Sequence, residues 1–194
     1  MMQEIARLSL AKVSPEEAEP RAKEALEGAR KAMGFVPNLY ANMANVPSVL
    51  ESYITGYRAF REDSGFTPAE QETVFLTVSR ENSCGYCMAA HSLVGEKMSA
   101  VPAADLAALR NNRPLPSVKL QALSEFTRIM VDKRGKPTPS ELRAFLAAGY
   151  SEPQVLSVIL AIAVKTISNY VNHVFHTEID SAFMGHRWDG AQAS

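Results

Sequence analysis

The sequence predicts an all-α protein, and three observations support this prediction. Apolar residues recur at helical spacing, most clearly over residues 47–63, and that period is typical of an amphipathic helix. Helix-start signals, in which a capping residue precedes a proline and an acid, occur at Thr67-Pro68 and Thr138-Pro139. No segment alternates apolar and polar residues for long enough to predict a strand. We therefore expect one helical domain over residues 1–194.

The first 46 residues are predicted to form a helical arm. Ser14-Pro15 is a helix-start signal, although Pro20 lies inside the segment and the regular helix can begin only there. Gly34 suits the left-handed cap that ends many helices. A short second helix is expected to end before Pro47.

Residues 47–130 are predicted to form the core of the domain. Asn82-Ser83 interrupts the helical pattern, and Ser83 is a suitable cap for a new helix. This part of the chain is expected to contain helices over residues 47–63, 68–81, 84–98, 102–110 and 117–133.

Residues 131–194 are predicted to add two helices, over 139–148 and 152–183. The start signal at Ser151 and the apolar helix after it resemble the segment that begins at Thr67, so a duplicated helix pair is one interpretation. Shared helix-start residues explain most of that similarity. Lys165 lies among apolar residues of the last helix, and we expect it to reach solvent or pair with an acid rather than act in catalysis.

The composition excludes several classes of protein. The chain has 20 Lys and Arg against 21 Asp and Glu, so it lacks the surplus positive charge of a nucleic-acid-binding protein. Its beginning has no basic segment followed by an apolar stretch, and its longest strongly apolar run, over 155–164, is about half the length of a spanning helix. We expect a cytoplasmic protein with no membrane or nucleic-acid partner.

The two cysteines, Cys84 and Cys87, form a Cys-x-x-Cys motif that His91 follows. Offsets of three, four and seven residues share one face of a helix. A helix N-terminus favours a thiolate over a thiol, and a histidine one turn further on can accept the thiol proton. Glu72 lies on the preceding helix among apolar neighbours. A buried carboxylate there needs a partner, and His91 is the natural one.

Other interpretations of this motif remain open. The cysteine pair can be structurally inert, or Cys84, Cys87 and His91 can supply three of the four ligands of a zinc site. The pair can also serve a non-enzymatic redox sensor whose oxidation changes assembly or partner binding. His173 either lines the thiol pocket or belongs to a polar helix end or subunit contact. We favour a dithiol that works without metal or cofactor.

The spacing of Glu72, Cys84, Cys87 and His91 resembles the signature of the alkyl hydroperoxidase D branch of the carboxymuconolactone decarboxylase-like superfamily. Eleven residues separate Glu72 from Cys84, and three separate Cys87 from His91. The resemblance covers residues 47–130. Two further segments, 34–39 and 169–173, are similar to the peroxidase-related proteins of that group.

The resemblance implies an all-helical fold assembled as trimers or hexamers, and thiol-dependent reduction of hydroperoxides. In that scheme Cys87 is the attacking thiol, Cys84 the resolving thiol, His91 the base and Glu72 the residue that orients it. An external dithiol or a thioredoxin-like protein would restore the oxidised pair. The cysteine pair argues against lactone decarboxylation, because the decarboxylase branch has no such pair.

Tyr86 departs from the family pattern. Alkyl hydroperoxidase D has a histidine immediately before the second cysteine, where this chain has Tyr86. A phenol is a poor base at neutral pH but can donate a hydrogen bond. We therefore expect Tyr86 to shorten the proton relay or to change the rate or the substrate.

Overall fold

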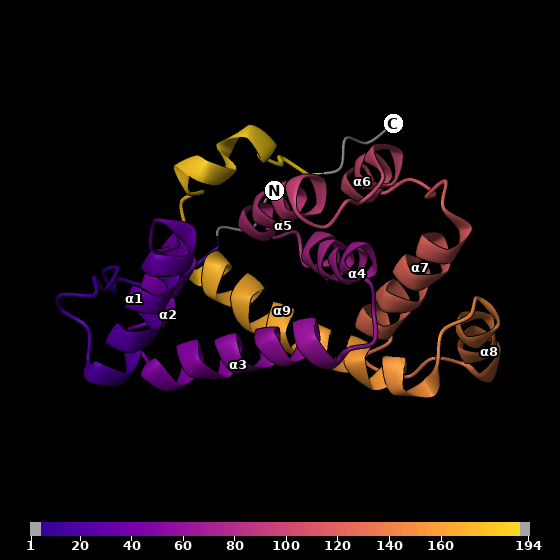
Figure 1. The fold of residues 1–194 in the computed structure, drawn as a ribbon, viewed down its shortest axis with the longest axis horizontal. Coiled ribbons are helices and arrows are strands. Elements are labelled where there is room, and N and C mark those ends of the chain that lie inside the picture. The colour runs from indigo at the N-terminus through magenta and orange to yellow at the C-terminus, as the bar shows by residue number, and fades with distance from the viewer. Residues whose placement is uncertain (1–4, 191–194) are drawn as a thin grey trace.

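The computed structural model describes residues 5–190, and within them every regular element is a helix (Figure 1). The all-α prediction is confirmed. The elements are α1 (Pro20–Met33), α2 (Asn38–Met43), α3 (Pro47–Asp63), α4 (Pro68–Glu81), α5 (Gly85–Lys97), α6 (Ala103–Arg110), α7 (Val118–Asp132), α8 (Pro139–Ala147), α9 (Glu152–Phe175) and the 3-10 helix η1 (Ser181–His186).

Helix α4 lies at the centre of the molecule. Every residue from Glu70 to Arg80 is buried, and α4 contacts α5, α6, α7 and α9. In Figure 1, α1 and α2 lie at one end of the molecule and α7 and α8 at the other. Polar side chains on α4 are therefore enclosed by protein and must find partners there.

The predicted start signals act as helix caps. Thr67 and Glu70 form a capping box, in which the Thr67 backbone N–H donates to the Glu70 carboxylate at 2.8 Å. Thr138 begins α8 and Ser151 begins α9 in the same way. Each such cap stabilises its helix by about 1 kcal/mol, so the sequence defines these starts locally.

The structure confirms the later of the two starts that the sequence allows for the first helix, because α1 begins at Pro20. Two other predicted helix boundaries are corrected. Ser83 adopts a left-handed turn with φ 54°, which leaves Cys84 instead of Ser83 as the N-cap of α5. The last helix ends at Phe175 instead of Phe183. His176 is left-handed there, and the Thr177 N–H bonds back to the Asn172 carbonyl, so the chain reverses and places η1 against α5.

Helix α9 is long and apolar enough, by length and composition alone, to cross a membrane. In this fold it packs against α2, α3, α4 and α5. Its buried face carries polar residues, among them Lys165, Ser168 and Asn172. Only 33% of its most apolar stretch is buried, so α9 also presents apolar side chains on its outer side.

Candidate active site

The turn between α4 and α5 positions the two sulfurs. The Cys84 N–H donates to the Ser79 carbonyl at 2.9 Å and closes the turn. Cys84 caps α5, and Cys87 is the third residue of that helix. Both are free thiols, with exposed fractions of 1% and 2%. The motif is therefore held at a helix N-terminus inside the protein, as the sequence predicts.

Helix α9 supplies polar contacts to the sulfurs. The Asn172 amide donates to Cys87 Sγ at 3.3 Å and to Cys84 Sγ at 3.6 Å. Ser168 Oγ accepts from the Cys87 thiol at 3.7 Å and donates to the Lys165 carbonyl at 3.1 Å. The sequence predicts no role for Ser168 or Asn172. Their spacing of four residues places both on one face of α9, but only the folded chain shows that this face meets the thiols.

The two thiols differ in acidity. Hydrogen bonding to Cys87 and burial both raise the pKa of Cys84. Burial would raise the pKa of Cys87 too, but the hydrogen bond from Cys84 and the charge of Lys165 outweigh burial and hold it well below its usual value. Cys87 is therefore the more acidic of the two thiols.

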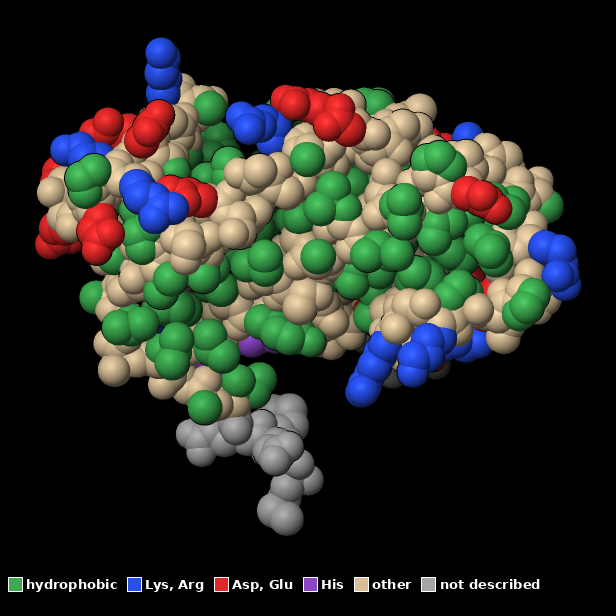
Figure 2. All heavy atoms as spheres, turned by 90° about the horizontal axis from the view of Figure 1, so that it is seen from below, with side chains coloured by type: hydrophobic (Ala, Val, Ile, Leu, Met, Phe, Trp, Pro, Cys, Tyr) green, Lys and Arg blue, Asp and Glu red, His purple; other side chains and the backbone are tan. Residues whose placement is uncertain are grey.

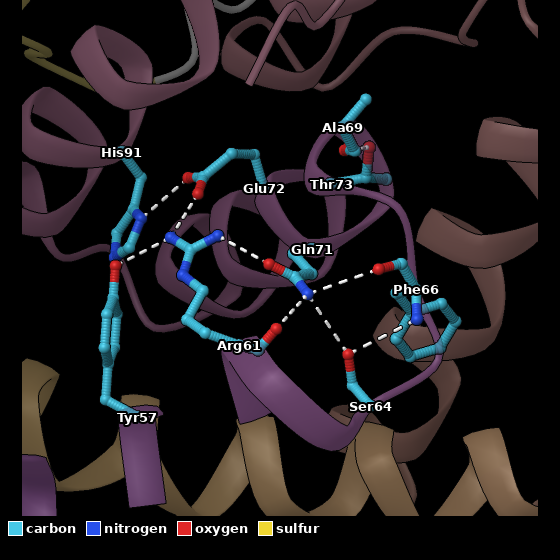
Figure 3. Close-up of polar contacts among 9 residues, drawn as sticks. All are labelled: Tyr57, Arg61, Ser64, Phe66, Ala69, Gln71, Glu72, Thr73 and His91. Atoms are coloured by element: carbon cyan, nitrogen blue, oxygen red, sulfur yellow. Dashed lines mark hydrogen bonds and ion pairs between the residues drawn. The ribbon is translucent and has the colours of Figure 1, made fainter. Parts of the chain in front are cut away.

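Glu72 and His91 meet across the α4–α5 pair, as predicted. His91 Nδ1 lies 2.8 Å from Glu72 Oε2, and Glu72 is fully buried (Figure 3). The other carboxylate oxygen forms an ion pair with Arg61 of α3, which the sequence analysis did not find. Arg61 lies eleven residues before Glu72 on another helix, and no local pattern links the two.

Arg61 is itself fixed by neighbours. It donates to the Tyr57 hydroxyl at 2.7 Å and to Gln71 Oε1 at 3.0 Å. Gln71 in turn donates to the carbonyls of Arg61 and Phe66, at 2.9 and 3.2 Å (Figure 3). This network holds the guanidinium against Glu72, and so fixes the carboxylate that holds His91.

The charge states at this centre follow from burial and pairing. Burial alone would raise the pKa of Glu72, but His91 and Arg61 outweigh it, so the carboxyl stays ionised. Burial and the charge of Lys165 lower the pKa of His91, although Glu72 opposes them. His91 is therefore a neutral imidazole at neutral pH, and it can accept a proton.

The two auxiliary residues occupy different places. The Tyr86 hydroxyl donates to Asp180, and burial and that carboxylate raise the pKa of the phenol. Tyr86 therefore anchors the segment before η1. His173 lies in the wall of a pocket of about 570 Å³ that Cys84 also lines, and its ring stacks on Tyr170.

A second pocket, of about 160 Å³, lies beside Cys87. Its wall includes four tyrosines and three groups that can take part in chemistry: Cys87, His91 and Lys165. Lys165 is completely buried, and its Nζ has no hydrogen-bond partner within residues 5–190. The expectation that Lys165 reaches solvent or pairs with an acid is wrong, because the residue takes a place on the buried face of α9.

Among the residues that the structure describes, no three His, Cys, Asp or Glu side chains are grouped in a way that can hold a metal ion. Cys84, Cys87 and His91 thus do not form the three-ligand set of the zinc interpretation. In addition, Nδ1 of His91 is already hydrogen-bonded to Glu72.

The sequence matches no family model and no curated protein. Its structure is similar to the alkylhydroperoxidase AhpD core of a peroxidase-related protein from Ralstonia eutropha JMP134, with a TM-score of 0.80, 17% identity, and coverage of 93% of this chain and 95% of that one. A peroxidase-related protein from Silicibacter sp. TM1040 is similar with a TM-score of 0.75 and 19% identity, and the match covers 95% of this chain and 96% of that one.

The debrominase Bmp8, in complex with 2,3,4-tribromopyrrole, is also similar, with a TM-score of 0.70 and 11% identity over 94% of this chain and 97% of that one. These likenesses extend over nearly the whole length of each chain. At such identities they establish the fold. The chain therefore has the alkylhydroperoxidase AhpD-like all-α fold that its motif resembles.

Proposed function

We propose that this protein is a thiol peroxidase of the cytoplasm, which reduces hydroperoxides through a Cys84/Cys87 dithiol–disulfide cycle. One observation carries the proposal. Cys87, the more acidic thiol, shares a pocket wall with His91, and Glu72 holds the imidazole through its Nδ1. A nucleophile, a base and a residue that orients the base are the parts that thiol catalysis requires.

The proposed cycle begins when His91 takes the proton of the Cys87 thiol. The thiolate attacks the outer oxygen of the hydroperoxide, so that an S–O bond forms and the O–O bond breaks. The protonated imidazole gives its proton to the departing alkoxide, which leaves as an alcohol. Cys87 is then a sulfenic acid, and the peroxide has gained two electrons.

Cys84 completes the oxidative half of the cycle. Its sulfur attacks the sulfenic acid, a disulfide forms, and the hydroxide leaves with the Cys84 proton as water. An external dithiol or thioredoxin-like protein then reduces the disulfide by thiol–disulfide exchange. Cys84 also lines the wider pocket of about 570 Å³, and this position supports the approach of a reductant from that side.

The test is peroxide consumption with a dithiol reductant, measured for the wild-type chain and two variants. We expect Cys87→Ser to lose turnover completely. Cys84→Ser should react once, giving a stable sulfenic acid at Cys87 that dimedone traps and mass spectrometry detects. A Cys87→Ser variant that keeps full turnover would contradict the mechanism.

Two other functions give different results in the same assay. A redox sensor would form the disulfide once and change its assembly without turnover. The likeness to the debrominase suggests reduction of a halogenated aromatic compound, and the tyrosine-lined pocket beside Cys87 favours that candidate. Bromide release from a bromopyrrole, without consumption of any hydroperoxide, would support it over the peroxidase.

A further inference from the structure

We propose that Lys165, in the wall of the 160 Å³ pocket beside Cys87, is a further catalytic residue that holds the reacting oxygen of the hydroperoxide. The inference rests on the proposed function and adds a residue to it. Its first observation is that Lys165 lines this pocket and that its Nζ is buried without a hydrogen-bond partner within residues 5–190.

A fully buried amine without a partner is costly, because burial removes its hydration and nothing replaces it. A polar group left in this state in a native protein calls for an explanation, and a role in the reaction is one. The contact that the structure gives Nζ is a weak one, 5.5 Å from the centroid of the Phe75 ring. The amine is therefore free to bind a group that enters the pocket.

The buried face of α9 supports a role in the reaction. It is apolar at Val158 and Ala161, and it becomes polar at Lys165, Ser168 and Asn172. Ser168 and Asn172 contact Cys87, and Lys165 lies one turn before Ser168. The change in character thus coincides with the place where α9 meets the thiols.

The reaction has a use for a positive charge at this position. When Cys87 attacks, negative charge moves from the sulfur to the alkoxide oxygen that leaves. An ammonium group fixed in the pocket stabilises negative charge both on the attacking sulfur and on the leaving oxygen, as donors in an oxyanion hole do. His91 supplies the proton that the alkoxide takes up, and Lys165 takes no part in proton transfer, so the balance of the cycle is unchanged.

The first experiment compares single-turnover oxidation of the reduced protein by tert-butyl hydroperoxide in three chains: wild type, Lys165→Met and Thr127→Val. Thr127 is also buried, and its hydroxyl has no partner among the described residues, so it controls for removal of such a group away from the thiols. We expect Lys165→Met to slow oxidation about 100-fold and Thr127→Val to leave it unchanged. Neither variant should lower the melting temperature, since each removes an unpaired polar group.

A second readout does not depend on peroxide turnover. In a Cys84→Ser background, alkylation of Cys87 by anionic iodoacetate is compared with alkylation by neutral iodoacetamide. Lys165→Met should slow iodoacetate by about ten-fold more than iodoacetamide, because only the anion is attracted by the amine. An unchanged ratio of the two rates would overturn the role of Lys165, whether or not the protein is a peroxidase.

The two readouts separate failure of this inference from failure of the proposed function. A wild-type chain that consumes no hydroperoxide would instead end the proposed function, and the alkylation ratio would still decide whether Lys165 serves this pocket.

Discussion

Glu72 is fully buried and lies between two partners, His91 and Arg61. A carboxylate is tolerated in the interior only when its charge is paired and hydrogen-bonded. The Arg61 guanidinium is always charged and supplies that pairing, so His91 need not be protonated to stabilise Glu72. The result is a neutral imidazole held by an ionised acid, which is the state that a general base requires.

At the scale of the residue, this arrangement predicts a pH dependence of stability. Burial and the charge of Lys165 depress the pKa of His91 below its unfolded value, so the unfolded chain binds a proton there first as the pH falls. The contribution of His91 to the free energy of unfolding is complete above about pH 6.5 and is lost as the pH falls through the pKa of His91 in the folded chain. We expect the free energy of unfolding to drop by about 1 kcal/mol between pH 7 and pH 5.5 from this group alone.

Urea denaturation at several pH values measures this effect. His91→Gln removes the titrating group and should flatten the profile over that range, whereas His176→Gln, a change at an exposed residue, should leave it as in wild type. Identical slopes for wild type and His91→Gln would contradict a buried neutral imidazole. Glu72 adds a further loss at lower pH, because its pKa is depressed as well.

At the scale of the element, the contact between α3 and α9 depends on Gly56. A Cβ built at Gly56 would lie 2.8 Å from a methyl carbon of Val164, which is closer than packed atoms allow. Val164 is buried and β-branched, so it has few rotamers with which to give way. Because α3 and α9 lie so close together at Gly56, the polar face of α9 reaches the site.

Gly56→Ala should therefore lower the free energy of unfolding by about 1 kcal/mol, because overpacking outweighs the better helix propensity of alanine. Gly28→Ala is the matched control, since nothing lies within 4 Å of a Cβ at Gly28 in α1. That change should raise stability by about 0.5–1 kcal/mol. Thermal or urea denaturation measures both, and a Gly56→Ala chain as stable as the Gly28→Ala chain would refute the packing argument.

At the scale of the whole molecule, α9 also presents an apolar strip outward. Leu156, Ile159, Tyr170 and Val174 lie along it and are exposed. Figure 2 views the molecule from below, the side on which α3 and α9 lie in Figure 1, and hydrophobic side chains are spread over that face. Apolar surface of this kind marks contact sites in soluble proteins, and a second copy of the chain is the occupant that the trimer or hexamer prediction requires.

We predict that the wild-type chain is a trimer or hexamer when light scattering is measured after size-exclusion chromatography. Ile159→Lys should shift it toward the monomer, because a charge in the contact would be buried without a partner. Val118→Lys, at an exposed apolar residue of α7, should not change the assembly. A monomeric wild-type chain would contradict the prediction outright.

Many of the helix boundaries follow from short-range signals in the sequence. The capping boxes at Thr67 and Thr138 and the left-handed Gly34 are short-range signals. The two helix starts and the one helix end that they define could therefore be predicted. The end of the last helix could not. Apolar residues continue past Phe175, and only the reversal at His176, which lets η1 pack on α5, ends the helix there.

Three features could be predicted without the structure: the helical class, the spacing that brings Cys84, Cys87 and His91 to one face, and the pairing of His91 with Glu72. Those features depend on neighbours in the chain or on two consecutive helices. Three features are visible only in the folded chain: Arg61 neutralises Glu72, Asn172 binds both sulfurs, and Lys165 is buried without a hydrogen-bond partner among residues 5–190. Each of these depends on α3 or α9 crossing the α4–α5 pair, and contacts between helices distant in sequence leave no periodic signal in either one.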